Sequence, residues 1–427
     1  MTEAPTGEAA ARALDAADPL GKLRGRFELP LGPDGTPAIY FCSNSLGAMP
    51  RAARSEVGTL LEAWATLGVR GHETGAHPWI DFHAPFAAPL ASLVGADPAE
   101  VVAMNSLTVN LHLLLASFYR PTTTRHRILI EQGAFPSDRY AVVSQLEFHG
   151  RSAPDSLLEV APQPGADTLS TESVIEAIER AGASLALVLL PGVQYLTGEV
   201  LDLRAISASA ARVGAAIGWD LAHAIGNVPL ALHDSGVDFA VWCSYKYLCG
   251  GPGAVAGAFV HARHGTNATL PRLAGWWGHD AASRFAMPDR FRPMPGAEGW
   301  QLSNPPVLAL APLKAALAEF EAAGIARLRE KSLALTRFAR AALERRVGAR
   351  VEVLTPAAPE AHGAQLSLRI PGGAAAGRRV HAALGAAGVI GDWREPDVIR
   401  LAPAPLYNTF GEVERAIGHL AQAVGLP

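Results

Sequence analysis

One lysine of this chain stands where a buried strand is expected to end. Lys246 lies between two tyrosines in CSYKYLCGGPG (243–253), directly after the apolar run VDFAVW (237–242). The chain has only four lysines and otherwise uses arginine for positive charge. Lysine, unlike arginine, can lose its proton and attack a carbonyl carbon as an amine. The pattern favours a nucleophilic amine, although a surface lysine at a strand end is the commoner alternative.

Two further polar residues follow a second apolar run. Asp220 ends AAIGWD (215–220), and His223 comes about one helical turn later. A carboxylate at the end of a buried strand needs a cationic partner, and a pyridinium nitrogen is one such partner. Asp, His and then Lys at strand ends is typical of pyridoxal 5'-phosphate sites, where the lysine forms a Schiff base and the aspartate keeps the ring nitrogen protonated. The alternatives are a helix cap for Asp220 and a satisfied core histidine for His223.

A phosphate group would also need hydrogen-bond donors. The segment MNSLTVNLHLLLASF (104–118) runs from a polar turn into an amphipathic helix, with Leu107 and Thr108 at its start. Backbone N–H groups and a hydroxyl at that place can bind an anion, although an ordinary N-cap explains them equally well. Phe135, which follows the run RILIE (127–131), can stack on a flat ring or pack in the core. Together these residues predict pyridoxal 5'-phosphate as the cofactor.

The elements that position these residues alternate along the middle of the chain. The apolar runs are RILIE (127–131), LALVLL (185–190), AAIGWD (215–220), DFAVWC (238–243) and AVAGAFVH (254–261). Helical patterns separate them, which is typical of an α/β domain with a mostly parallel sheet covered on both faces. Ligands of such sheets bind beyond the carboxyl ends of the strands, where Asp220 and Lys246 fall.

From about residue 304 the pattern changes to a long helical run with a proline interruption at Pro312, then short strands and a last helix. We therefore predict three parts. Residues 1–60 form an N-terminal segment that packs on the small domain. Residues 61–310 form the large cofactor-binding domain, and residues 311–427 form a small C-terminal α+β domain.

Composition excludes several classes of protein. The 427 residues are 49% hydrophobic and 18% charged, which argues against disorder, and the net charge of -4 argues against nucleic-acid binding. No apolar run reaches the roughly 18 residues of a membrane span, and the N-terminus lacks the pattern of a secretory signal. The three cysteines, Cys42, Cys243 and Cys249, are expected to be reduced. We expect a cytoplasmic protein without a metal site or a membrane partner.

Several segments together resemble the kynureninase family, in order from about residue 39 to about residue 410. They are FCSNSLG, RGHETGAHPW, MNSLTVNLHLLLASFY, AFPSDRYAV, PGVQYLTGE, WDLAHAIGNVPLALHDSGVDFAVWCSYKYL, GWWGH, LSNPPVL and IRLAPAPLYNTF. The resemblance implies the fold of aspartate aminotransferase (fold type I of pyridoxal phosphate enzymes) with a seven-stranded sheet. It also implies a homodimer with active sites shared between subunits, and hydrolytic Cβ–Cγ cleavage of kynurenine or 3-hydroxykynurenine to alanine and anthranilate or 3-hydroxyanthranilate. Tryptophan catabolism and NAD biosynthesis are the pathways that such a reaction serves.

The resemblance also implies roles for single residues. The catalytic residues would be Lys246, Tyr245 and Asp220, with Lys246 bonded to the cofactor and Tyr245 a proton donor. The residues that contact the cofactor would be Leu107, Thr108, Phe135, Asp138, Asp220, His223, Tyr245 and Lys246, with Trp276 and Asn304 from the other subunit. Arg400 would bind the substrate α-carboxylate, a task that suits its planar fork. Relatives that carry Ser or Thr at position 191 have a hydroxyl there, whereas this chain has Pro191.

Substrate preference is expected to depend on the remaining predicted residues, which are Ser45, His72, His279, Ser303 and Asn304. One branch of the family carries Trp, Gly and Thr at positions 72, 303 and 304 and is associated with kynurenine. The His, Ser and Asn of this chain resemble the branch that favours the 3-hydroxy substrate. Polar groups facing a ring hydroxyl penalise the analogue that lacks it.

Three other functions would each need features of their own. A cysteine desulfurase-like lyase would need a mobile nucleophilic cysteine, and Cys249 lies too close to Lys246 along the chain. A zinc hydrolase would use His72, His77 and His83, but their spacing matches no known zinc motif. A protein that binds the cofactor without catalysis would have lost a required residue, and none is missing.

Overall fold

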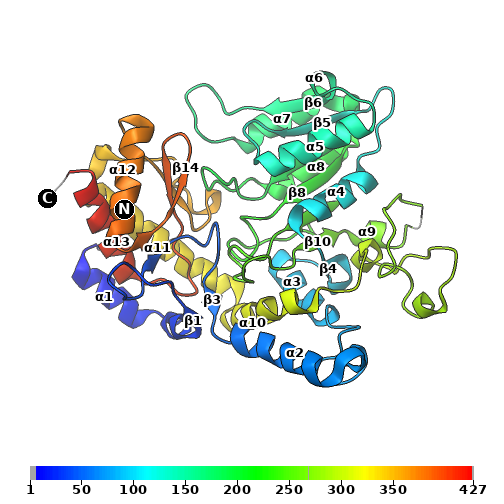
Figure 1. Cartoon of the computed structure of the whole chain (residues 1–427). Helices are drawn as coiled ribbons and strands as arrows, with labels where there is room; N and C mark the ends of the chain where they lie inside the picture. Colours follow the sequence, from blue (N-terminus) through cyan, green and yellow to red (C-terminus); the bar gives the residue numbers. More distant parts are fainter. Residues whose placement is uncertain (1–5, 268, 426–427) are drawn as a thin grey trace.

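The computed structural model describes residues 6–267 and 269–425. Its largest element is a seven-stranded sheet in the order β4-β10-β9-β8-β7-β5-β6 (Figure 1). The strands are β4 (Val101–Ala103), β5 (Arg127–Glu131), β6 (Leu157–Val160), β7 (Leu185–Pro191), β8 (Ala216–Asp220), β9 (Phe239–Trp242) and β10 (Gly257–Val260). Only β10 runs antiparallel to its neighbours in this sheet. The predicted mostly parallel, seven-stranded sheet is confirmed.

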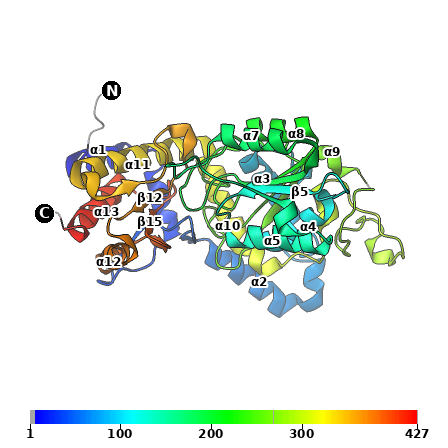
Figure 2. The ribbon, with the colours of Figure 1, turned by 90° about the horizontal axis from the view of Figure 1, so that it is seen from above.

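The central strands are buried on both faces because helices cover both. In β5, Ile128 and Ile130 pack in one core cluster and Leu129 packs in the other, as the two-residue period of a strand requires. Figure 2 shows α4 and α5 on one side of the sheet and α7 and α8 on the other. These helices are α4 (Leu107–Phe118), α5 (Pro136–Phe148), α7 (Thr171–Ala181) and α8 (Leu203–Val213). This explains why the strands are continuous apolar runs.

Other helices complete this half of the molecule and connect it to the second. They are α2 (Ala53–Leu67), α3 (Ala87–Val94), α6 (Ala153–Ser156), α9 (Ala262–Gly265) and α10 (Val307–Ala323). Helix α2 packs along α10, and both lie at the foot of the molecule in Figure 1. The expected interruption at Pro312 is wrong, because α10 continues through Pro312 and the chain turns at Gly324, with φ of 77°. Glycine adopts this φ readily, whereas the missing N–H of one proline removes only one helical hydrogen bond.

The second half contains a four-stranded antiparallel sheet in the order β11-β12-β15-β14. Its strands are β11 (Glu352–Val353), β12 (Leu366–Arg369), β14 (Asp392–Arg394) and β15 (Val398–Leu401), and its helices are α11 (Ile325–Arg346), α12 (Gly373–Ala386) and α13 (Phe410–Ala423). The apolar faces of the helices and of the sheet enclose a separate core cluster that includes Leu335, Ile399 and Ile417. An independent core of this kind is what a second domain requires.

The N-terminal segment lies against this second half. Helix α1 (Glu8–Ala17) packs on α13, and β2 (Ile39–Tyr40) pairs in parallel with β13 (Val389–Ile390). Two further short strands, β1 (Phe27–Glu28) and β3 (Met49–Pro50), pair with each other. The division into 1–60, 61–310 and 311–427 remains our proposal. Within the described ranges, no helix combines the length and the hydropathy needed to cross a bilayer.

Candidate active site

A cavity lies at the carboxyl ends of the parallel strands. It is lined by residues that follow β5, β7, β8 and β9 and by the first turns of α4 and α5. The lining residues are Leu107, Thr108, Glu131, Phe135, Ser137, Asp138, Pro191, Val193, Tyr195, Asp220, Ala222, His223, Tyr245 and Lys246. The structure thus brings together eight residues predicted from the sequence, namely Leu107, Thr108, Phe135, Asp138, Asp220, His223, Tyr245 and Lys246.

The amine of Lys246 projects into this cavity beside two aromatic rings. Its Nζ lies 5.7 Å from the ring centre of Phe135 and 5.9 Å from that of Tyr245. No salt bridge to this amine is present in the described part of the chain. The segment that carries Lys246 is held by Gly47, whose N–H donates a hydrogen bond of 2.8 Å to the carbonyl of Tyr245. A Cβ at position 47 would lie only 2.4 Å from the carbonyl oxygen of Lys246, which explains the glycine of FCSNSLG.

Two carboxyl groups meet on the wall formed by β8 and α5. Asp220 Oδ1 accepts a hydrogen bond of 2.7 Å from the N–H of Ala222, which fixes its orientation. Asp138 is buried, and burial and then the charge of Asp220 raise its pKa well above the usual range. Two carboxyl groups in such contact cannot both be ionised at low cost. We therefore assign a proton to Asp138, while Asp220 remains available to a cationic N–H group.

A third carboxyl group on the cavity wall was missed by the sequence reasoning. Glu131 ends β5, and burial and then the charge of Glu199 raise its pKa to about 8. Burial also raises the pKa of Glu199 to about 8. Gln194 Nε2 donates to Glu131 Oε1 at 3.4 Å. The available signal was a glutamate that ends the apolar strand RILIE, the same signal that identified Asp220.

His223 is neutral in this setting. Burial and then the charge of Lys246 lower its pKa well below the usual value. Its Nδ1 atom and the Oδ1 atom of Asp138 are buried without a hydrogen-bond partner in the described structure. Polar atoms left unpaired on a cavity wall are costly unless a ligand satisfies them. A planar cofactor with polar substituents fits these two atoms.

The start of α4 offers a place for a phosphate group. Ser106 is its N-cap residue, without a side-chain capping bond, and Asn105 before it adopts the left-handed φ of 51°. The side chain of Asn105 donates to Asn110 Oδ1 at 3.0 Å, which holds the turn in place. The N–H groups of the first turn and the Thr108 hydroxyl are then available to an anion, and their role as a phosphate site stays a prediction.

Arg400 lies behind the cavity and does not line it. The alternative of a surface charge is wrong, because Arg400 is 0% exposed. Its Nε atom donates to Asp392 Oδ1 at 2.6 Å, and its guanidinium also pairs with the second oxygen of Asp392 and with the carbonyl of Tyr195. Tyr195 lines the cavity and therefore lies between Arg400 and the cavity.

The remaining predicted residues lie elsewhere in the single chain. His72 and Asn304 line a second hollow with Leu60, Trp64, Trp79, Trp277, Val307 and Leu308. Trp276 is 47% exposed, and its Nε1 donates to the carbonyl of Arg284. His279 is buried and bonded to Ser283, whereas Ser303 is exposed and Ser45 is half-buried. None of these six residues lines the cavity around Lys246 in the single chain.

The alternative chemistries find no support in the geometry. Cys249 is buried, and burial raises its pKa to about 12, so it remains a thiol. His72, His77 and His83 are not among the groups with metal-ligand spacing, since in the described residues only Glu100, His233 and His261 form such a group. Neither a cysteine nucleophile nor a zinc-bound water is therefore placed at the cavity.

Comparison with known proteins agrees with this geometry. A family model described as "Kynureninase C-terminal domain" matches residues 328–420. The chain is 56% identical over 413 residues to the kynureninase of Xanthomonas axonopodis pv. citri (strain 306), which covers 97% of each chain. It is 54% identical over 420 residues to the kynureninase of Xanthomonas campestris pv. campestris (strain B100), which covers 98% of each.

Solved structures share the fold at low sequence identity. The apo cysteine desulfurase from Thermococcus onnurineus NA1 has a TM-score of 0.74 at 16% identity, over 91% of this chain and 94% of that chain. A C-DES mutant with glycine covalently linked to the PLP-cofactor has a TM-score of 0.75 at 18% identity, over 95% of this chain and 99% of that chain. These similarities confirm the predicted fold class.

Proposed function

The chain belongs to the kynureninase family, and from that premise we propose that it hydrolyses the Cβ–Cγ bond of L-kynurenine or 3-hydroxy-L-kynurenine with pyridoxal 5'-phosphate as cofactor. The products are L-alanine and the matching anthranilate. The observation that carries the proposal is the meeting of Lys246, Asp220, Asp138 and His223 at one cavity, in a chain that aligns with kynureninases over nearly its whole length. A cytoplasmic location and a role in tryptophan catabolism or NAD biosynthesis belong to the same proposal.

The walls of the cavity suggest how each residue would hold the cofactor. Asp220 would accept the ring N–H and keep it charged, while the neutral His223 would pack beside the ring. The first turn of α4, with Thr108, binds the phosphate through N–H and O–H donors. Phe135 would stack near the ring, and Lys246 would hold the cofactor through its aldehyde group. When bound, pyridoxal phosphate supplies an electron sink for the substrate carbon atoms.

Other residues act on protons and on the substrate. The amine of Lys246, once released, removes the Cα proton of the substrate and can return a proton to a neighbouring carbon. Burial raises the pKa of Tyr245, so its hydroxyl keeps a proton that it can donate near the γ-carbonyl or Cβ. Water adds to the γ-carbonyl before the Cβ–Cγ bond breaks. Arg400 binds the α-carboxylate, provided that the substrate takes over part of the pairing that Asp392 now supplies.

The test is product formation by the purified enzyme. The wild-type protein, loaded with pyridoxal phosphate, should release an aromatic amine and alanine in equal amounts from at least one of the two substrates. Lys246→Ala should lower kcat by at least about 100-fold, because a general base contributes roughly that much or more. Lys22→Ala is the control, since Lys22 is exposed and distant in sequence from the cavity. Full activity of Lys246→Ala would refute the proposal.

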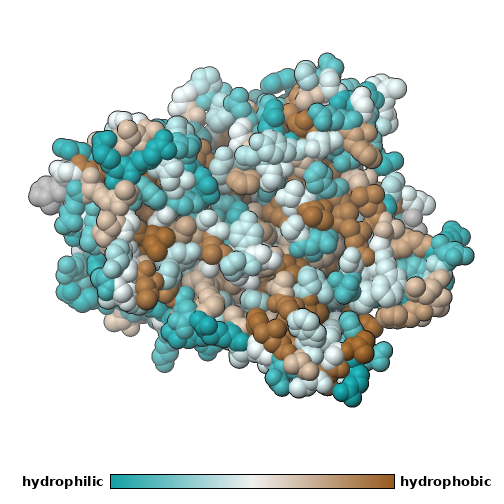
Figure 3. Space-filling view, viewed as in Figure 1, coloured by the Kyte–Doolittle hydropathy of each residue, from teal (hydrophilic) through white to brown (hydrophobic). Residues whose placement is uncertain are grey.

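We also propose that two copies of the chain share each active site. His72 and Asn304 line a hollow over α2 and α10 that includes the exposed Trp64 and Leu308. Figure 3 shows hydrophobic side chains gathered over this part of the surface. An exposed apolar patch of this kind marks an interaction surface. A second copy seated there would bring Trp276 and Asn304 of one chain toward Lys246 of the other.

The preferred substrate is proposed to be 3-hydroxykynurenine. His72, Ser303 and Asn304 are polar and accessible, so they can pair with the ring hydroxyl once the pocket is complete. A site built to bind a hydroxyl leaves its own polar groups unpaired when the hydroxyl is missing. The triple variant His72→Trp, Ser303→Gly, Asn304→Thr should therefore lower the ratio of kcat/KM for 3-hydroxykynurenine over kynurenine by at least about 10-fold. A wild-type ratio that favours kynurenine would contradict the proposal.

A further inference from the structure

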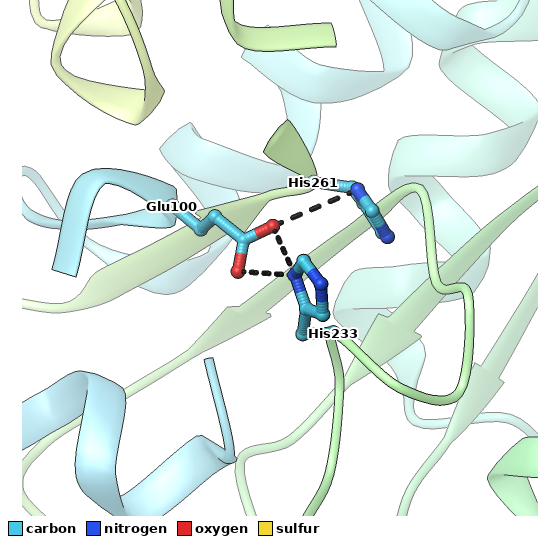
Figure 4. Close-up of side chains that lie close together, drawn as sticks. All are labelled: Glu100, His233 and His261. Carbon is cyan, nitrogen blue, oxygen red and sulfur yellow. Dashed lines mark hydrogen bonds and ion pairs between the residues drawn. The ribbon is translucent and has the colours of Figure 1, made fainter. Parts of the chain in front are cut away.

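A second group of chemically active side chains lies away from the cavity. Glu100, His233 and His261 converge from three different segments, as Figure 4 shows. Glu100 precedes β4, His233 lies in the loop before β9, and His261 follows β10. Because β10 is antiparallel to β4 and β9, the end of β10 meets the starts of the other two. The group therefore sits at the amino edge of the sheet, opposite the edge that carries Lys246.

The ligand atoms of the three side chains point toward one another. His233 Nδ1 lies 2.9 Å from Glu100 Oε1, and His261 Nδ1 lies 3.6 Å from the same oxygen. All three atoms fall within 4.8 Å of one another. A tetrahedral Zn²⁺ with bonds of about 2.0–2.2 Å separates its ligand atoms by about 3.3–3.6 Å. The observed separations bracket that range, so small side-chain movements would complete the geometry.

The chemistry of the group favours a cation between its members. His261 Nδ1 accepts a hydrogen bond of 3.2 Å from the N–H of Arg263, so this nitrogen carries no proton, and an ion would take over its single lone pair from that bond. The same nitrogen faces a carboxylate oxygen, which also carries lone pairs. The two imidazole rings stack 4.8 Å apart at 24°, an arrangement that would be repulsive if both rings were protonated. A divalent ion would replace two present hydrogen bonds, the one between His233 and Glu100 and the one from Arg263 to His261, with bonds to the metal.

Hydrogen bonds hold the Glu100 carboxylate in place before any ion binds, which favours its use as a metal ligand. Glu100 is only 1% exposed, and its oxygens accept backbone N–H groups from Asp97 at 2.9 Å and Ala262 at 2.7 Å. These bonds leave lone pairs on both oxygens. His233 is the accessible member, with a side chain that is 42% exposed, so an ion and a water ligand can enter from its side. Two histidines and one glutamate form a donor set that Zn²⁺ prefers.

We propose that Glu100, His233 and His261 form a binding site for one divalent transition-metal ion, such as Zn²⁺, on each chain. The ion would tie the edge strand β4 to β10 and to the loop before β9. Strand β4 leads at its other end to the turn before α4, at the cofactor cavity. The role of the ion is structural, and the cleavage reaction does not pass through it.

The experiment uses the enzyme loaded with pyridoxal phosphate, stripped of metals by a chelator and then desalted. Calorimetric titration with Zn²⁺ should show one saturable site per chain. His233→Gln and His261→Gln should each weaken that site by at least about 10-fold, the usual loss when a metal site loses a ligand or its support. Co²⁺ in place of Zn²⁺ should give the intense visible absorption of a tetrahedral complex, and both variants should lose it.

His264→Gln is the matched control. His264 lies three residues after His261, but its Nε2 bonds to Asp238 Oδ1 at 2.7 Å and not to Glu100. This variant should keep the wild-type affinity for Zn²⁺, and His233→Gln should keep the wild-type cleavage rate in metal-free buffer. The proposal is overturned if the wild type shows no saturable site, if all four proteins bind Zn²⁺ equally, or if His264→Gln loses the ion as fully as the other two. If the wild type still cleaves its substrate under any of these outcomes, only the metal site is refuted and the proposed function stands.

Discussion

Tyr245 stands next to the amine of Lys246 and keeps its proton, since burial raises its pKa. We expect Tyr245→Phe to bind the cofactor with little change and to lower kcat by about 10²–10⁴-fold, the usual contribution of a positioned proton donor. KM should change much less than kcat, because the lost hydroxyl acts on developing charge and not on substrate binding. Steady-state rates of aryl-product release measure both quantities. Undiminished turnover by Tyr245→Phe would remove the tyrosine from the mechanism.

Glu131 should make the folding stability depend on pH, and its raised pKa sets the direction of that dependence. Between its ordinary pKa of 4.5 and its folded-state pKa of about 8, the unfolded chain releases a proton that the folded chain retains. Folding stability therefore falls as pH rises through this window, and the contribution is lost above it. Glu131→Gln cannot ionise, so its Tm should fall less than that of the wild type between about pH 5 and about pH 8. Glu330→Gln, at an exposed site on α11, is the control and should follow the wild type. Parallel Tm curves for Glu131→Gln and the wild type would contradict this assignment.

For single residues, the sequence identified those that are polar and directly follow an apolar strand. Lys246 and Asp220 were singled out because a polar residue and a strand end coincide, whereas Asp138, in the first turn of α5, was named only from the family resemblance. Glu131 was not singled out, although it also ends a strand, because a glutamate there is ordinarily solvated and only the fold reveals the buried Glu199 beside it. The pairing of Arg400 with Asp392 depends on two strands of the small sheet meeting in register, which no local pattern specifies.

The conformation of the loop after β9, which carries Lys246, depends on close packing against the segment that contains Gly47. A Cβ on Gly47 would lie 2.4 Å from the carbonyl oxygen of Lys246 and 2.6 Å from the Sγ of Cys249. The backbone oxygen cannot move away without displacing the lysine, so Gly47→Ala should cost about 1–3 kcal/mol of folding free energy. It should also reduce cofactor binding. Gly58→Ala in α2, where a Cβ meets nothing within 4 Å, should be neutral or stabilising, by up to about 1 kcal/mol. Urea unfolding and absorbance of the bound cofactor check both variants, and equal stability of the two would contradict the argument.

The strands that the sequence located are those whose residues are apolar and buried without interruption. Strands β5, β7, β8 and β9 were predicted to within a few residues because each is a buried apolar run. Strands β4 and β6 were missed, since β4 has three residues and β6 is partly exposed, so neither run stands out. Their places come from pairing with β10 and β5, which is a property of the sheet and not of the segments.

At the scale of the whole molecule, the predicted site residues are spread over more than one place. Eight of them line the cavity that contains Lys246, His72 and Asn304 line the hollow over α2 and α10, and the remaining ones line neither. In the single chain, His72 and Asn304 do not line the cavity around Lys246. We propose that a second chain, related by two-fold symmetry, brings them to it.

Complementation between two defective chains tests this sharing directly. One chain carries Lys246→Ala, and the other carries Trp276→Ala with Asn304→Ala; each alone should be nearly inactive. In a mixed dimer, one site combines the intact Lys246 of the second chain with the intact Trp276 and Asn304 of the first. Random pairing makes half of the dimers mixed with one working site of two, so co-expression should restore about a quarter of wild-type activity. If each active site were built from a single chain, no pairing could repair it, and the co-expressed mixture would be no more active than the two variants alone.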